Sequence, residues 1–207
     1  MTSLLLRCGV AGPILFVLVF SIEGALRPGY RARRHFVSLL ARGQRGWVQA
    51  SSFIVCGVLS LCFVAGLAQT VDGMVLPVLF AIFGVGLVAS GIFPCDAGLG
   101  YPPGAPATWP RTASRSGNLH NLAGALVFGS LAISAFVAAG RADSRGFAIY
   151  SIATGAAVLI LFVITGALAA GVRDESADPP IGIIQRLAIG VGWTWMVVFA
   201  IRVITTR

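Results

Sequence analysis

Residues 71–93 read VDGMVLPVLFAIFGVGLVASGIF, an apolar run in which Asp72 is the one charged residue. A helix needs about 20 such residues to cross about 30 Å of hydrocarbon, so this run predicts a transmembrane helix. Five further runs are long enough to do the same: Leu4–Leu26, Trp47–Ala68, Leu119–Ala139, Gly146–Val172 and Ile181–Ile204. We therefore predict an all-α polytopic membrane protein, a six-transmembrane-helix bundle, with residues 1–207 forming a single integral membrane domain.

The composition supports a membrane protein over the other classes. Of the 207 residues, 57% are hydrophobic and 11% are charged, and the mean hydropathy is +0.90. Soluble domains carry about 25% charged residues, and disordered chains lack apolar surface to bury, so both classes are excluded. The net charge is +8. Because the arginines lie in short loops between apolar runs, they indicate membrane anchoring rather than nucleic-acid binding.

Two loops are long enough to build a structure of their own. Loop one, Gly24–Gly46, contains six arginines, and its segment His35–Leu40 predicts a short interfacial helix with apolar side chains in lipid. Loop three, Pro94–Asn118, is rich in proline and glycine but holds Tyr101 and Trp109, which favours an ordered structure. We expect loops one and three to form a polar cap over one end of the bundle.

The arginines also predict an orientation. Loops one, three and five, with Arg186 at the start of the last span included, carry ten of the fifteen arginines. Loops rich in arginine are retained in the cytoplasm, so we expect these three loops on the cytoplasmic side of the inner membrane. The excess comes from loop one alone, and a headgroup-binding role for its arginines would remove it.

Four polar residues are predicted at this same end of the bundle. Glu23 ends the first span, Asp96 follows the third, and His120 and Gln185 begin the fourth and sixth. Because ionisable groups are costly near lipid, their gathering at one mouth indicates a site. We predict that Glu23, Asp96 and His120 meet there as catalytic groups. Asp96 would donate a proton, His120 would orient it, and Glu23 would stabilise positive charge.

Each of these three residues also has a structural interpretation. Glu23 can pair with Arg27 at the i+4 spacing of a helix. Asp96 can accept hydrogen bonds from the amides of a turn. His120 can be a satisfied polar residue at a helix start. The sequence leaves both interpretations open.

Other residues are assigned to binding. Tyr101, Asn121 and Gln185 are expected to hold the polar end of a substrate. Trp193 and Trp195 differ by about 200° around the helix axis, so both cannot line a cavity equally, and Trp193 is favoured.

The charged loops receive separate predictions. Arg31, Arg33 and Arg34 are expected to bind anionic lipid headgroups, each contributing about 1 kcal/mol. The acidic segment near the sixth span is expected to be a solvated loop without a role; it contains Asp174, Glu175 and Asp178.

No metal and no cofactor are predicted. No second histidine or cysteine lies at i+3 or i+4 from His120, and one histidine at a span start is a poor basis for haem. The four cysteines include no Cys-x-x-Cys pair and are interpreted as small apolar residues. The expected partners are the membrane and a lipophilic small molecule or lipid, and the oligomeric state is not predicted.

Several motifs occur in order along nearly the whole chain: Gly12-Pro13 with Glu23, Gly46-Trp47-Val48-Gln49, Phe93-Pro94-Cys95-Asp96-Ala97-Gly98, Leu119-His120-Asn121-Leu122-Ala123-Gly124, and Gln185-Arg186 with Trp193. The chain thereby resembles the bacterial six-span membrane family catalogued as domain of unknown function 998. Phe36 and Cys95 depart from that pattern, where proline and threonine are often found. The resemblance implies a membrane location and a six-span fold, and no reaction.

Three functions remain open. The first is a metal-independent membrane enzyme that uses acid catalysis to isomerise or cyclise an isoprenoid-type substrate. The second is a carrier of a small lipophile, which a weak echo between Gly84-Val85-Gly86 and Gly190-Val191-Gly192 supports as an inverted repeat. The third is a non-catalytic component that binds lipid.

Overall fold

The computed structural model describes residues 1–173 and 177–206. Its six long helices are α1 (Thr2–Leu26), α2 (Gly46–Leu67), α3 (Val75–Ile92), α4 (Arg115–Ala139), α5 (Arg145–Gly171) and α6 (Ile181–Thr205). All six are long and apolar enough to cross a membrane, which confirms the predicted bundle and makes the chain a multi-pass membrane protein. Helices suit this environment because each satisfies its own backbone hydrogen bonds in lipid. No β-strand occurs within the described ranges.

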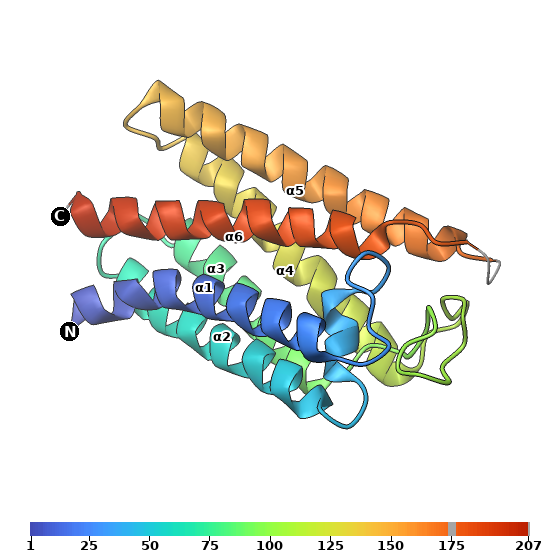
Figure 1. Cartoon of the computed structure of the whole chain (residues 1–207). Coiled ribbons are helices and arrows are strands. Elements are labelled where there is room, and N and C mark those ends of the chain that lie inside the picture. The colour runs from blue at the N-terminus through green and yellow to red at the C-terminus, as the bar shows by residue number, and fades with distance from the viewer. Residues whose placement is uncertain (174–176, 207) are drawn as a thin grey trace.

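The helices form a ring. Each helix packs against the next in the chain, and α6 returns to pack against α1. Both termini lie at one end of the bundle, and the three longer loops lie at the other (Figure 1). Close approach depends on small residues: a Cβ at Gly57 of α2 would lie 2.7 Å from the carbonyl oxygen of Gly84 in α3.

Aromatic side chains fill the ring toward the termini. Phe63, Phe80 and Trp195 are fully buried, and the rings of Phe80 and Trp195 stack with their centroids 6.3 Å apart. The indole N–H of Trp195 donates to the Ser151 hydroxyl at 2.9 Å, which satisfies the polar atom of a buried ring. These rings form a packed core inside the ring of helices.

The segment predicted to lie in lipid instead lies inside the protein. Loop one contains a short 3₁₀ helix, η1 (Val37–Ala41), which contacts α1, α2 and α6. Leu39 and Leu40 are 0% exposed. The prediction of an interfacial helix was wrong, because the apolar side chains of this segment close the end of the helix ring rather than facing lipid.

Candidate functional site: a cavity beneath the cap

The cap is organised around a buried arginine. The guanidinium of Arg27 donates to the Glu23 carboxylate at 2.8 Å, to the Leu40 carbonyl at 3.1 Å and to the Tyr101 hydroxyl at 3.2 Å. It also donates to the carbonyls of Arg42 and Arg45. Glu23 receives a second ion pair from the Arg45 side chain. One side chain thus joins the end of α1 to both long loops.

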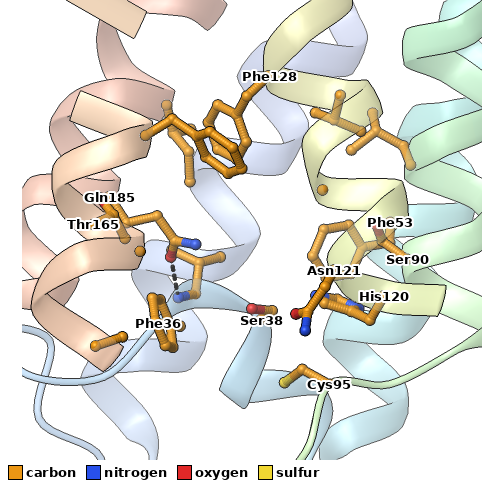
Figure 2. Close-up of a pocket in the computed structure, with 18 of the residues that line it drawn as sticks. Phe36, Ser38, Phe53, Ser90, Cys95, His120, Asn121, Phe128, Thr165 and Gln185 are labelled. Carbon is orange, nitrogen blue, oxygen red and sulfur yellow. Dashed lines mark hydrogen bonds between the residues drawn. The ribbon is translucent and has the colours of Figure 1, made fainter. Parts of the chain in front are cut away.

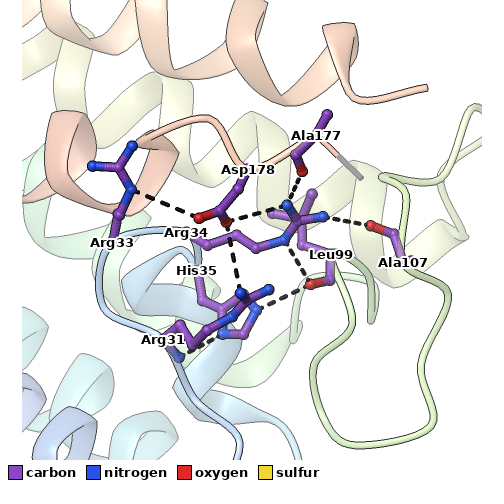
Figure 3. Close-up of polar contacts among 8 residues, drawn as sticks. All are labelled: Arg31, Arg33, Arg34, His35, Leu99, Ala107, Ala177 and Asp178. Atoms are coloured by element: carbon purple, nitrogen blue, oxygen red, sulfur yellow. Dashed lines mark hydrogen bonds and ion pairs between the residues drawn. The ribbon is translucent and has the colours of Figure 1, made fainter. Parts of the chain in front are cut away.

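A second buried cluster surrounds His35 and Arg34 (Figure 3). The Nδ1 atom of His35 accepts from the Arg31 backbone N–H at 2.9 Å, so the Nε2 atom carries the proton and donates to the Leu99 carbonyl at 3.0 Å. Burial lowers the pKa of His35 to about 4. Arg34 donates to the carbonyls of Leu99, Ala107 and Ala177. Both side chains therefore hold the cap together.

The same cluster corrects two predictions. Arg34 is 2% exposed, so the headgroup role predicted for it was wrong: its guanidinium is occupied inside the cap. Arg31 and Arg33 have side chains 61% and 60% exposed and keep that role as a prediction. Asp178 was expected to have no role, yet its carboxylate lies within ion-pair distance of all three arginines, at 3.4 to 3.8 Å. Asp174 and Glu175 lie outside the described residues.

Beneath the cap lies a cavity of about 310 Å³. All six helices and both long loops contribute to its wall. Its lining is mainly apolar, and the aromatic members are Phe16, Phe36, Phe53, Trp109, Phe128, Phe162 and Trp193. The Trp193 ring stacks on Phe16 with centroids 5.7 Å apart and meets Phe83 edge-on at 5.1 Å. These contacts fix the orientation of the indole in the wall.

The polar residues of the cavity gather toward the cap. Figure 2 shows Ser38, Cys95, His120 and Asn121 at this end, with Phe128 at the other. Gln185 lies on the wall opposite Asn121, and its Oε1 atom accepts from the Val37 backbone N–H at 2.7 Å.

These polar side chains are amide, hydroxyl, thiol and imidazole groups. The described residues that line the cavity include no arginine, aspartate or glutamate.

The predicted catalytic residues do not share this cavity. His120 lines it, and its Nδ1 atom lies 2.9 Å from the Phe93 carbonyl. Glu23 is 3% exposed and ion-paired with Arg27 and Arg45. The Asp96 carboxylate accepts from the Ser114 backbone N–H at 2.9 Å. Neither carboxylate is among the cavity-lining residues, so the three groups do not meet as the sequence predicted.

Some of the residues predicted to bind a substrate line the cavity, and others are buried elsewhere. Asn121, Gln185 and Trp193 line the cavity, and Trp195 lies in the packed core. Tyr101 is 2% exposed, and its hydroxyl accepts from Arg27 within the cap.

The sequence prediction missed several cavity residues. Ser38 lies in the segment that was assigned to lipid, and Thr165 and Gly166 lie within the fifth span. The fifth span contains two threonine–glycine pairs, Thr154-Gly155 and Thr165-Gly166, and such a pair leaves room beside a polar atom. The sequence alone does not show that the second pair lines the cavity while Gly155 packs against Phe136. Phe36 and Trp109 meet edge-on at 4.9 Å, a contact between two loops that no local pattern predicts.

No metal site is apparent in the described part of the chain. It contains no group of three or more histidine, cysteine, aspartate or glutamate side chains placed to hold an ion.

One family model matches residues 10–202 and is described as protein of unknown function DUF998. The chain belongs to this family. The match covers α2 to α5, both cap loops and most of α1 and α6, so the cavity and cap of this DUF998 protein lie within the family's domain. No curated protein and no solved structure matches the chain.

Proposed function

We propose that the cavity binds a lipophilic molecule with a neutral polar end, held with that end toward the cap. The proposal rests on one observation: the charged side chains near the site lie in the cap, and the cavity beneath it is lined by uncharged polar and apolar side chains. The buried charges of the cap are ion-paired or hydrogen-bonded within it, while the cavity offers only amide, hydroxyl, thiol and imidazole groups. Binding is also the step that an enzyme, a carrier and a lipid-binding component share.

A neutral polar end follows from the cost of burying charge. A phosphate or ammonium group in the cavity would lack an opposite charge among the described lining residues, and an unpaired buried ion is strongly unfavourable. A hydroxyl, carbonyl or amide needs only hydrogen bonds. The amides of Asn121 and Gln185 carry both donors and acceptors on facing walls. Long-chain alcohols and quinone-like molecules are therefore the favoured ligand class.

The test is a search for lipid that copurifies with the protein, with identification by mass spectrometry. Gly124 lines the cavity, and a Cβ there would meet no atom within 4 Å, so Gly124→Leu can fill space without distorting the helix. Gly129→Leu is the matched control, because it lies on the same helix with equally open space and does not line the cavity.

We expect the wild type and Gly129→Leu to retain a neutral lipid, and Gly124→Leu to lose at least about 90% of it, the tenfold change that about 1.4 kcal/mol produces. Equal retention by all three proteins would contradict binding in this cavity. Recovery of phospholipid alone would contradict the neutral polar end.

A catalytic use of the cavity is supported by His120. Acid-catalysed isomerisation or cyclisation of an isoprenoid chain needs one proton added to a double bond and one lost from a neighbouring carbon, without a co-reactant. An imidazole can both donate and accept a proton, His120 lies at the polar end of the cavity, and the aromatic faces of Phe16 and Trp193 can stabilise the intermediate positive charge. Burial raises the pKa of the Cys95 thiol to about 11, so that thiol stays neutral.

Two matched variants test this catalytic form with an isoprenoid alcohol or quinone as substrate. His120→Gln should abolish product formation while ligand retention persists. Asp96→Asn should lower the melting temperature, because the carboxylate bonds the turn before α4, and leave turnover by folded protein unchanged. Loss of turnover in folded Asp96→Asn would indicate that the carboxyl group of Asp96, rather than His120, donates the proton.

We also propose that the cap faces the cytoplasm at the inner membrane, on the strength of the arginine distribution. Two of the arginines on the cap side, Arg27 and Arg34, are buried and stabilise the cap, so their presence there does not depend on the orientation in the membrane. A cysteine introduced at exposed Arg33 should react with a membrane-impermeant thiol reagent only after the cells are permeabilised. Reaction in intact cells would reverse the orientation.

A further inference from the structure

The cavity reaches the outer surface of the bundle on one side. Three of its lining residues are exposed: Asn121 on α4, and Gly166 and Ala170 on α5. The same residues therefore belong to the cavity wall and to the surface that would face lipid. Since the exposed lining residues from spanning helices all lie on these two helices, the cavity opens between α4 and α5.

The packing of α5 fits an opening at this place. Helix α5 packs against α4 and α6, and its most apolar window is only 22% buried, the lowest value of the six spans. Helices α4 and α5 meet at their short connection and diverge toward the cap (Figure 1). A Cβ at Gly124 or Gly166 would meet no atom within 4 Å, so glycines border the gap where larger side chains would close it.

One aromatic contact bounds the opening away from the cap. Phe128 of α4 and Phe162 of α5 stack with centroids 4.8 Å apart, and both line the cavity. Asn121 and Gly166 lie on the cap side of this pair, within about two helical turns of the cap ends of their helices. The opening therefore faces the leaflet on the cap side.

The cavity is small for a whole lipid. Its volume of about 310 Å³ lies at the lower end of the range of about 300–1,000 Å³ typical of pockets for small molecules. A longer ligand must leave part of its chain outside the cavity. The opening between α4 and α5 offers a route that keeps this part in hydrocarbon.

We propose that the ligand is a single-chain lipid that enters sideways from the cap-side leaflet, and that its hydrocarbon tail stays in the bilayer between α4 and α5. This inference rests on the proposed binding function. It adds the route, the orientation and the number of chains of the ligand: the polar end lies near Asn121 and Gln185, and the tail passes Gly166.

Two photoreactive long-chain alcohols test the route in lipid nanodiscs. One carries a diazirine beside its hydroxyl group, and the other carries it at the far end of the chain. Labelled residues are identified by mass spectrometry. The first probe should label cavity residues, among them Asn121 and Gln185. The second should label the lipid-facing sides of α4 and α5 that flank the opening.

A blocking variant supplies the control. Gly166→Trp places a large ring in the opening, whereas Gly146→Trp places it at the other end of α5, where a Cβ also meets no atom within 4 Å. Gly166→Trp should lower cavity labelling by the first probe at least tenfold, and Gly146→Trp should leave it unchanged.

The outcomes separate the two proposals. Cavity labelling that persists in Gly166→Trp, or tail labelling on α1, α2 or α6, would overturn the sideways route and leave the binding site standing. Failure of the first probe to label any cavity residue in the wild type would overturn the binding function and the route together.

Discussion

The cap and the cavity beneath it lie in contact but use polar side chains in opposite ways. In the cap, charged groups are buried and their bonds are satisfied inside the protein, as with Arg27 and Glu23. In the cavity, the polar groups are uncharged and face open space, as with Asn121 and Gln185. The charged residues of the cap therefore stabilise the fold, while the uncharged polar groups of the cavity face open space that a ligand could fill.

The largest expected effect is the loss of Arg27. Arg27→Met should destabilise the protein by about 3–5 kcal/mol, because the variant leaves the buried Glu23 carboxylate without its buried partner. Thermal unfolding in detergent measures the effect. Arg45→Gln is the comparison, since the side chain of Arg45 is 55% exposed and its pair with Glu23 is partly solvated. Equal destabilisation by both variants would contradict the central role of Arg27 in the cap.

Acid should weaken the cap through His35. The folded protein takes up this proton only near pH 4, compared with about 6.5 when unfolded, because burial lowers the pKa of His35. Between those values the unfolded chain binds more protons, so stability falls as the pH drops from 6.5 toward 4. The expected loss is on the order of 3 kcal/mol.

Melting temperatures at pH 7.5, 5.5 and 4.5 measure this effect of acid. His35→Gln removes the titrating group and should show a flatter pH dependence than the wild type, although it is less stable at pH 7.5. Parallel curves for the two proteins would assign the acid sensitivity to other groups.

Loop one contains both exposed and buried arginines, and we expect the two kinds to differ in lipid binding and in stability. Replacing both Arg31 and Arg33 by Gln should weaken binding to anionic lipid by about 2 kcal/mol, about 1 kcal/mol for each, with little change in melting temperature. Arg34→Gln should lower the melting temperature and leave binding to anionic lipid unchanged, because the guanidinium of Arg34 donates to three loop carbonyls. Native mass spectrometry with anionic and zwitterionic lipids distinguishes the two. Unaltered lipid preference in the double variant would leave these arginines without a headgroup role.

The smallest effect is expected in the cavity. Gln185→Leu removes the amide and should weaken binding of the long-chain alcohol probe about tenfold, or about 1.4 kcal/mol, with a smaller loss of stability from the bond to Val37. Competition against the photoreactive probe measures the affinity. Undiminished binding would place the polar end of the ligand elsewhere.

Patterns in the sequence were sufficient for the bundle and for the location of the cap. Six apolar runs predict six spans because lipid permits few other backbone structures, and alternation of the spans places Glu23, Asp96, His120 and Gln185 at one end. Helical geometry also predicts that Trp193 and Trp195 face different ways, and the position of Trp193 near Gln185 and Gly192 on the helical wheel favours Trp193 for the cavity.

Only the tertiary structure shows which of these polar side chains line the cavity and which are buried in the cap. Arg33 and Arg34 are neighbours in the chain, yet one is exposed and the other is 2% exposed, because Arg34 bonds carbonyls from loops three and five. Glu23 and Asp96 lie at the predicted end but are used inside the cap and at the start of α4. Local patterns report the depth of a residue in the membrane. Its partners depend on contacts between segments far apart in the chain, and those contacts arise only when the loops fold over the ring.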